Sequence, residues 1–128
     1  MSTERVQAEI ELLKRRHPDL ECRDDGWCRL ARYALPDGWS ESEVELAFRV
    51  PENIPGEQPY AFWTKPTLTL EDGRTPNNTS GPVDTDLGPG WQQWSWQLED
   101  WRPGPTPAEG SNVVDHFRSI AYRFRELD

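Results

Sequence analysis

The stretch EVELAFRV at 43–50 constrains the fold most strongly, because hydrophobic and polar side chains alternate along it. In an extended chain, successive side chains point to opposite faces, so alternation gives a strand one apolar and one polar face. The apolar face must be buried against another layer of the protein. The apolar face carries Val44, Leu46, Phe48 and Val50, and the polar face carries Glu45 and Arg49.

Two further segments have the composition of strands. WCRLARYAL at 27–35 is rich in aromatic and aliphatic residues and ends in PDG, a turn signal. YAFWTKPTLTL at 60–70 is interrupted or bordered by Pro66 and is followed by EDGR, which also favours a turn. Short turns between consecutive strands predict an antiparallel meander of three to four strands.

Both ends of the sequence carry helical patterns. A first helix is predicted at 4–16, with Ser2 or Thr3 as its N-cap and Pro18 just beyond its end. A second helix is predicted after Ser111 or Asn112. The chain is therefore expected to be one α+β domain over 1–128, with both helices on the apolar face of the sheet. The predicted buried stripes are Val6, Ile10 and Leu13 in the first helix and Val113, Phe117, Ile120 and Phe124 in the second.

The region between the meander and the second helix is harder to assign. TPNNTSGPVDTDLGPG at 75–90 has no periodicity, which predicts a long irregular region of the kind that is usually functional or mobile. The following segment, WQQWSWQLEDW at 91–101, has apolar residues at helical spacing and predicts a short helix. Within it, Trp91 and Trp101 are expected to be scaffold residues, and Trp96 is the better candidate for an exposed contact.

Composition excludes several classes of function. The chain of 128 residues has a formal net charge of −9 and no basic patch, so nucleic acid is not expected as a partner. No apolar run approaches the roughly 20 residues that cross a bilayer, and the first ten residues lack a signal-peptide core. We therefore expect no membrane partner, a cytoplasmic location and reduced, unpaired thiols at Cys22 and Cys28. Their spacing is not that of paired metal ligands, and no metal or other cofactor is expected.

Several motifs, in their order along the chain, resemble the ubiquitin-conjugating enzyme (E2) superfamily. VELAFRVP followed by ENIPGEQPYAF is similar to its strand-and-flap region. TPNN at 75–78 resembles the His-Pro-Asn tripeptide before the active site, with Thr75 in place of histidine. DWRPGP at 100–105 resembles the Trp-Ser-Pro stretch that leads to the carboxy-terminal helix. Nearly the whole chain is similar to the bacterial branch called prokaryotic E2 family E, which implies a UBC-like fold.

This resemblance also implies partners and a chemistry. The partners would be a ubiquitin-like protein, an E1-like activating enzyme and a deconjugating peptidase of the same pathway. An E2 carries the ubiquitin-like protein on a cysteine, and counting back from Trp101 to that position leads to Gln93. The sequence has no cysteine after Cys28, so a thioester at the usual place is excluded.

A hydroxyl nucleophile that forms an oxyester is the remaining option for acyl transfer. Ser95 is the first candidate because it lies two residues from Gln93, and Thr79 and Ser80 are the alternatives in the preceding loop. Asn77 is the candidate donor to the oxyanion. His17 and His116 belong to the helices, so the candidate bases are carboxylates: Asp84, Asp86, Glu99 and Asp100.

Three functions remain open at this stage. The first is an E2-like acyl carrier, with uncertain catalytic activity. The second is a non-catalytic adaptor, similar to E2 variants or RWD domains, in which Ser95 is an ordinary hydroxyl bonded to backbone or water. The third disregards the resemblance and is a carbohydrate-binding module, in which exposed tryptophans are the surfaces on which sugar rings stack.

Overall fold

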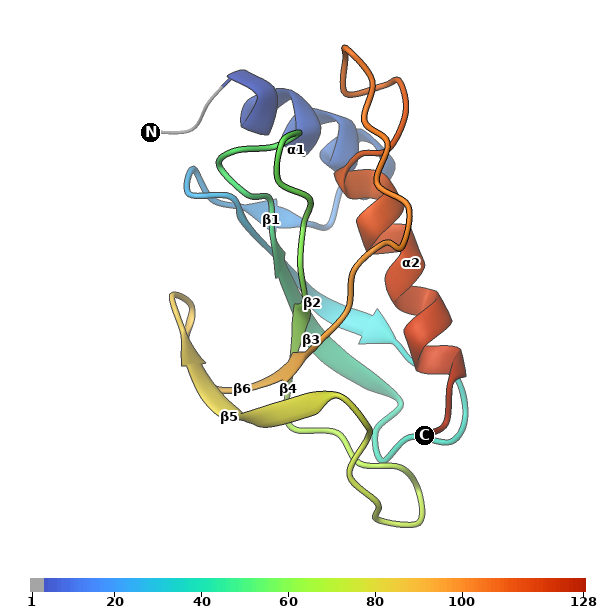
Figure 1. Cartoon of the computed structure of the whole chain (residues 1–128). Helices are drawn as coiled ribbons and strands as arrows, with labels where there is room; N and C mark the ends of the chain where they lie inside the picture. The colour runs from blue at the N-terminus through green and yellow to red at the C-terminus, as the bar shows by residue number, and fades with distance from the viewer. Residues whose placement is uncertain (1–3) are drawn as a thin grey trace.

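The structure is a computed structural model that describes residues 4–128, and its two layers are a sheet and a pair of helices (Figure 1). Within these residues the sheet is antiparallel and six-stranded, in the order β1-β2-β3-β4-β6-β5. The predicted α+β class is confirmed and is compatible with a UBC-like fold, although six strands replace the expected three to four. The elements are α1 (Glu4–Arg16), β1 (Glu21–Cys22), β2 (Trp27–Ala34), β3 (Glu43–Arg49), β4 (Phe62–Lys65), β5 (Thr79–Thr85), β6 (Gly88–Trp94) and α2 (Val113–Arg125).

Helix α1 has the predicted bounds and the predicted buried stripe; Ser2 and Thr3, the predicted caps, lie outside the described residues. The stripe also contains Glu9, which is fully buried. One Glu9 oxygen accepts a hydrogen bond from the Val113 backbone N–H at 2.7 Å, and the other accepts from Arg5 Nε at 3.0 Å. Burial raises the pKa of Glu9, although both donors act in the opposite direction. This carboxylate joins α1 to the first turn of α2.

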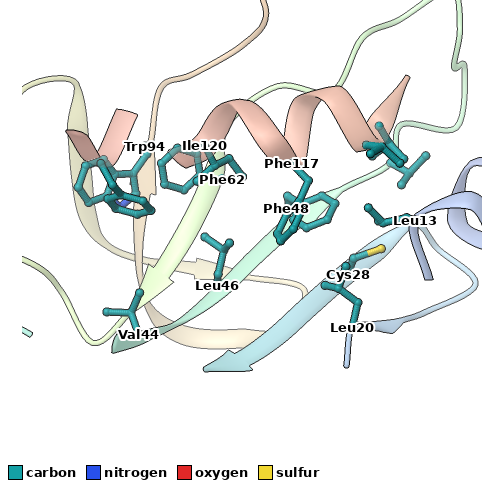
Figure 2. Packing of buried hydrophobic residues seen from close by; sticks show 14 of the residues in the cluster. Leu13, Leu20, Cys28, Val44, Leu46, Phe48, Phe62, Trp94, Phe117 and Ile120 are labelled. Atoms are coloured by element: carbon teal, nitrogen blue, oxygen red, sulfur yellow. The ribbon is translucent and has the colours of Figure 1, made fainter. Parts of the chain in front are cut away.

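Helix α2 begins after Asn112, which forms a capping box with Asp115 and settles the choice between the two predicted caps. Its predicted stripe is buried against the sheet, as expected. The Phe117 ring centroid lies 5.3 Å from that of Phe48 on β3 (Figure 2). The alternating face of β3 is therefore the face that the helices cover, as its pattern predicts.

From Thr79 onward the region 75–90 belongs to a β-hairpin, so the prediction of a long irregular segment is wrong. Strands β5 and β6 pair antiparallel, with a tight turn between Thr85 and Gly88. Their register shifts between Ser80 and Val83 and again before Thr85. Bulges of this kind break the two-residue period, and Gly81 at the first one has a φ of +138°. For this reason the alternation that marks a strand was absent from the sequence.

The tryptophan-rich segment is strand β6 with an extended continuation, and the predicted helix at 91–101 is wrong. Trp94 is buried in the main core, whereas Trp91 belongs to a second cluster with Trp27 and Ala47. The scaffold roles of Trp91 and Trp101 are confirmed, and Trp101 donates to the Pro55 carbonyl at 2.8 Å. Trp96 is half-buried and donates to Ser119 Oγ at 3.0 Å, so it is not the exposed contact that we expected.

The two cysteines form a disulfide, which corrects the prediction of unpaired thiols. Strands β1 and β2 place Cys22 directly opposite Cys28, with their Cα atoms 4.1 Å apart. The chain reverses between them at Gly26, whose φ is +93° and whose missing Cβ would collide with the Val50 carbonyl oxygen. The spacing alone did not reveal this reversal, because β1 is only two residues long.

Candidate functional site

The four predicted site residues come together at the open end of the β5–β6 hairpin. The strand register pairs Thr79 with Trp94 and Ser80 with Gln93. One step further along, the Ser95 backbone N–H donates to the Asn78 carbonyl oxygen at 2.9 Å. Ser95, Thr79, Ser80 and the preceding Asn77 therefore form one cluster, which we call the hydroxyl cluster.

The three hydroxyls of this cluster differ in their availability. Thr79 is half-buried, and its Oγ1 donates to the Pro76 carbonyl oxygen at 2.8 Å. Ser80 and Ser95 are exposed, and neither hydroxyl has a hydrogen-bond partner among residues 4–128. Ser95 and Ser80 are thus the hydroxyls that an incoming acyl group can reach.

The Asn77 backbone is held on both sides, while its side chain is exposed. Its N–H donates to the Asp128 carbonyl oxygen at 2.8 Å, and its carbonyl oxygen accepts from Arg123 Nη2 at 3.0 Å. The next residue, Asn78, has a φ of +60°, a left-handed conformation that asparagine tolerates better than most residues. These two hydrogen bonds anchor the backbone of the loop that carries the exposed Asn77 side chain.

Arg123 on α2 is the main residue of this region that sequence reasoning missed. Its side chain is only 4% exposed, and its guanidinium carbon lies 5.0 Å from the Trp94 ring centroid and 6.0 Å from that of Trp39. Besides Asn77, it donates to the carbonyl oxygens of Glu126 and Asp128 at 2.9 and 3.4 Å. Burial lowers the pKa of Arg123, and the carboxylates of Asp128 and Glu126 oppose this effect.

A signal for Arg123 was present in the sequence. The residue follows Ile120 by three positions and so falls on the buried stripe of α2. A charged residue on such a stripe is almost never buried without partners. The partners of Arg123 are backbone carbonyls and aromatic ring faces, and no sequence pattern predicts such partners.

The position where the superfamily carries its cysteine is an ordinary strand position here. Gln93 lies in β6 between Trp63 on β4 and Ser80 on β5. Its neighbour Gln92 is buried and binds both backbone polar groups of Leu68, with distances of 2.7 and 3.2 Å. These two glutamines support the sheet and offer no nucleophile.

The predicted bases are not gathered at the hydroxyl cluster. Asp86 lies at the closed end of the hairpin and accepts from Trp27 Nε1 at 3.0 Å, and Asp100 pairs with Arg102 at 2.8 Å. Asp84 and Glu99 are exposed. His116 is fully buried, with Nε2 3.0 Å from the Ala61 carbonyl oxygen. Burial lowers the pKa of His116 to about 4.

Two other kinds of site are absent from the part of the chain that the structure describes. Residues 4–128 contain no group of three histidine, cysteine or acidic side chains that is arranged to hold a metal ion. Among the same residues, neither helix is long and apolar enough to cross a membrane.

A helix, an antiparallel sheet and a second helix, with a Pro-Asn loop beside the last strand, define an E2-like α+β protein. The sequence model of prokaryotic E2 family E matches residues 7–120, so the chain belongs to that family. No curated protein and no solved structure matches the chain. Family membership argues against the carbohydrate-binding alternative, and six of the seven tryptophans are either buried or bonded through their N–H groups to protein atoms within residues 4–128: Trp27, Trp39, Trp91, Trp94, Trp96 and Trp101.

Proposed function

We propose that this protein is the acyl carrier of a bacterial ubiquitin-like conjugation pathway in the cytoplasm. It would receive a ubiquitin-like protein from an E1-like activating enzyme and hold it as an oxyester on Ser95. A deconjugating peptidase of the same pathway would reverse the final product. The observation that carries the proposal is the exposed Ser95 hydroxyl beside the Asn77–Asn78 loop, in an E2-family chain with no cysteine in this region.

The proposed transfer balances without a cofactor. Ser95 Oγ bonds to the carboxy-terminal carbonyl carbon of the ubiquitin-like protein, and the bond from that carbon to the activating enzyme's sulfur breaks. The hydroxyl proton ends on the departing thiolate. An amine then attacks the ester carbon, and Ser95 Oγ leaves and regains a proton. The Asn77 amide is proposed to donate to the oxyanion in both steps, where one such donor typically contributes about 3 kcal/mol.

A second candidate, an adaptor without catalysis, is favoured by one specific observation. In the described part of the chain, no histidine or carboxylate bonds to the Ser95 hydroxyl, and a hydroxyl without a base is a weak nucleophile. In this case the hydroxyl cluster would be part of a surface that binds the ubiquitin-like protein or the activating enzyme.

Reconstitution with the cognate activating enzyme, ATP and the ubiquitin-like protein separates the two candidates. Intact-mass analysis should detect one added ubiquitin-like protein, and the adduct should resist thiols but be cleaved by hydroxylamine. If the proteins bind one another and no adduct forms, the adaptor function is correct. If they neither bind nor react, both proposals are wrong.

A further inference from the structure

A surface hollow lies apart from the hydroxyl cluster, between the end of α1, the part of β2 around Tyr33 and the middle of α2. It is a hollow of about 520 Å³, within the range of pockets that bind small molecules. None of its lining residues belongs to the hydroxyl cluster. They are Arg16, His17, Tyr33, Phe117, Arg118 and Ala121.

Strand β1 is short, which leaves the stretch of β2 beside the hollow without an outer neighbour within residues 4–128. Its two residues pair only with Cys28 and Arg29, so from Leu30 onward β2 has no strand on its outer side in the described chain. A bulge between Leu30 and Tyr33 interrupts the pairing of β2 with β3 at the same level. Tyr33, which lines the hollow, therefore lies on a strand edge that no other described strand covers.

The floor of the hollow is aromatic. The His17 ring meets the Phe117 ring edge-on at 4.5 Å, and the Tyr33 ring meets it at 6.2 Å. Phe117 is only 7% exposed and packs against Phe48 of the main core. A flat apolar group can stack on such a surface.

The rim of the hollow is positively charged and short of partners. Arg16 forms no ion pair within residues 4–128, and Arg118 reaches only Asp115, at 4.0 Å. The Tyr33 hydroxyl has no hydrogen-bond partner among the same residues. Burial lowers the pKa of His17, and the charges of Arg118 and Arg16 act in the same direction.

The rim of the hollow is positively charged, although the whole chain has a formal net charge of −9. Two guanidinium groups and a phenol, all able to donate, surround one cavity with an apolar floor. Guanidinium groups bind carboxylate and phosphate oxygens through paired, charge-assisted hydrogen bonds. A ligand that complements both parts has an anionic head and a flat apolar body.

We propose that this hollow binds a small organic anion, a carboxylate or phosphate monoester carried on a flat apolar body. Arg16 and Arg118 hold the anionic head, and the Tyr33 hydroxyl donates a further hydrogen bond to it. The body of the ligand lies against His17 and Phe117. This site goes beyond the conjugation function and does not depend on it.

Calorimetric and ¹⁵N-NMR titrations of the full chain test the proposal with four probes. Phenyl phosphate and benzoate present the two head groups on the same ring, and binding of either at about 1 mM or tighter supports the site. Phenol lacks the charge and inorganic phosphate lacks the ring, so each should bind at least about tenfold more weakly than the better of the first two. The amide shifts should centre on residues 16–17, 33 and 117–121.

Matched variants decide whether the binding belongs to this hollow. Arg16→Gln combined with Arg118→Gln should weaken binding of the better probe by about tenfold or more, and Tyr33→Phe by about threefold. Arg74→Gln combined with Arg102→Gln removes the same charge at exposed positions and should leave binding unchanged. Circular dichroism checks that every variant is folded. The proposal is overturned if neither anion binds at about 1 mM or tighter, if both double variants behave alike, or if phenol binds as well as phenyl phosphate.

Discussion

The guanidinium of Arg123 donates a hydrogen bond to the Asn77 carbonyl oxygen across 3.0 Å, joining positions 46 residues apart. One end of this bond is in the last turn of α2, and the other is in the loop that enters β5. The helix layer thereby fixes the loop that borders the hydroxyl cluster. The Asp128 carbonyl, which accepts from both Arg123 and Asn77, reinforces the same connection.

Replacing Arg123 should therefore destabilise the protein and loosen this loop. We expect Arg123→Ala to lower the free energy of unfolding by about 3 kcal/mol, because three hydrogen bonds to backbone carbonyls and the packing of a buried guanidinium on Trp94 are lost. Urea denaturation measures the loss, and hydrogen exchange of the Asn77 amide should accelerate. Arg125→Ala, in the same helix but exposed, is the control and should change stability by less than about 0.5 kcal/mol. Equal effects of the two changes would contradict this role.

Phe117 should be one of the largest single contributors to the core. It is 7% exposed and contacts the rings of Phe48, Tyr33 and His17. We expect Phe117→Ala to cost about 3–5 kcal/mol in chemical denaturation, because the cavity it leaves is lined by packed rings. Tyr122→Ala removes an aromatic ring that is 56% exposed on the same helix and should cost much less. A cost below about 1 kcal/mol for Phe117→Ala would contradict the packing of α2 on the sheet through this ring.

The elements with an uninterrupted period were the predictable part of this fold. The spacing of Val6, Ile10 and Leu13 located α1 with its observed bounds, and the alternation at 43–50 identified both β3 and its buried face. Each pattern repeats several times within one helix or strand. These two elements can therefore be recognised from the local sequence, without knowledge of the tertiary contacts.

The hairpin and the disulfide were not predictable in this way. Gly81 and Pro82 sit at a bulge of β5, where the strand period is lost although the pairing continues. The hydroxyl cluster was located through the family resemblance, and the structure brings its residues together through the register of β5 and β6. Arg123 was missed because its partners are backbone carbonyls, which carry no side-chain signature.

The buried His116 should make the stability of the protein depend on pH. Burial lowers its pKa from 6.5 to about 4, and its Nδ1 is buried without a partner among the described residues. Between these two values the unfolded chain binds a proton that the folded chain does not, so stability falls as the pH drops. The contribution is complete above pH 6.5 and decreases by about 3 kcal/mol by pH 4.

Two measurements check the His116 prediction. Denaturation between about pH 7 and pH 5 should show a steeper loss of stability for the wild type than for His116→Gln, which cannot be protonated. In NMR titrations the His116 ring signal should not move over that range. A midpoint near 6.5 for this signal would contradict the prediction, and His17→Gln controls for the other histidine.

The disulfide between Cys22 and Cys28 should stabilise the fold without taking part in acyl transfer. It closes a short loop, and the chain-entropy model gives about 2 kcal/mol for such a loop. We expect Cys22→Ala combined with Cys28→Ala to lower the free energy of unfolding by this amount. The rate at which any conjugate forms should stay near that of the wild type, since β1 and β2 lie at the opposite edge of the sheet from β5. Loss of conjugation in a folded double variant would contradict the proposed nucleophile.

The choice of Ser95 as nucleophile is tested by changing the chemistry of its adduct. Ser95→Ala should abolish the hydroxylamine-sensitive adduct, whereas Ser80→Ala and Thr79→Ala should retain it. Ser95→Cys should form an adduct that thiols cleave, because a thioester then replaces the oxyester, and should form it faster since a thiol is the better nucleophile. Asn77→Ala should slow adduct formation by roughly 100-fold if its amide stabilises the oxyanion. If the Ser95→Ala protein keeps the adduct and Ser80→Ala loses it, the nucleophile is Ser80, which is also exposed at the same end of the hairpin.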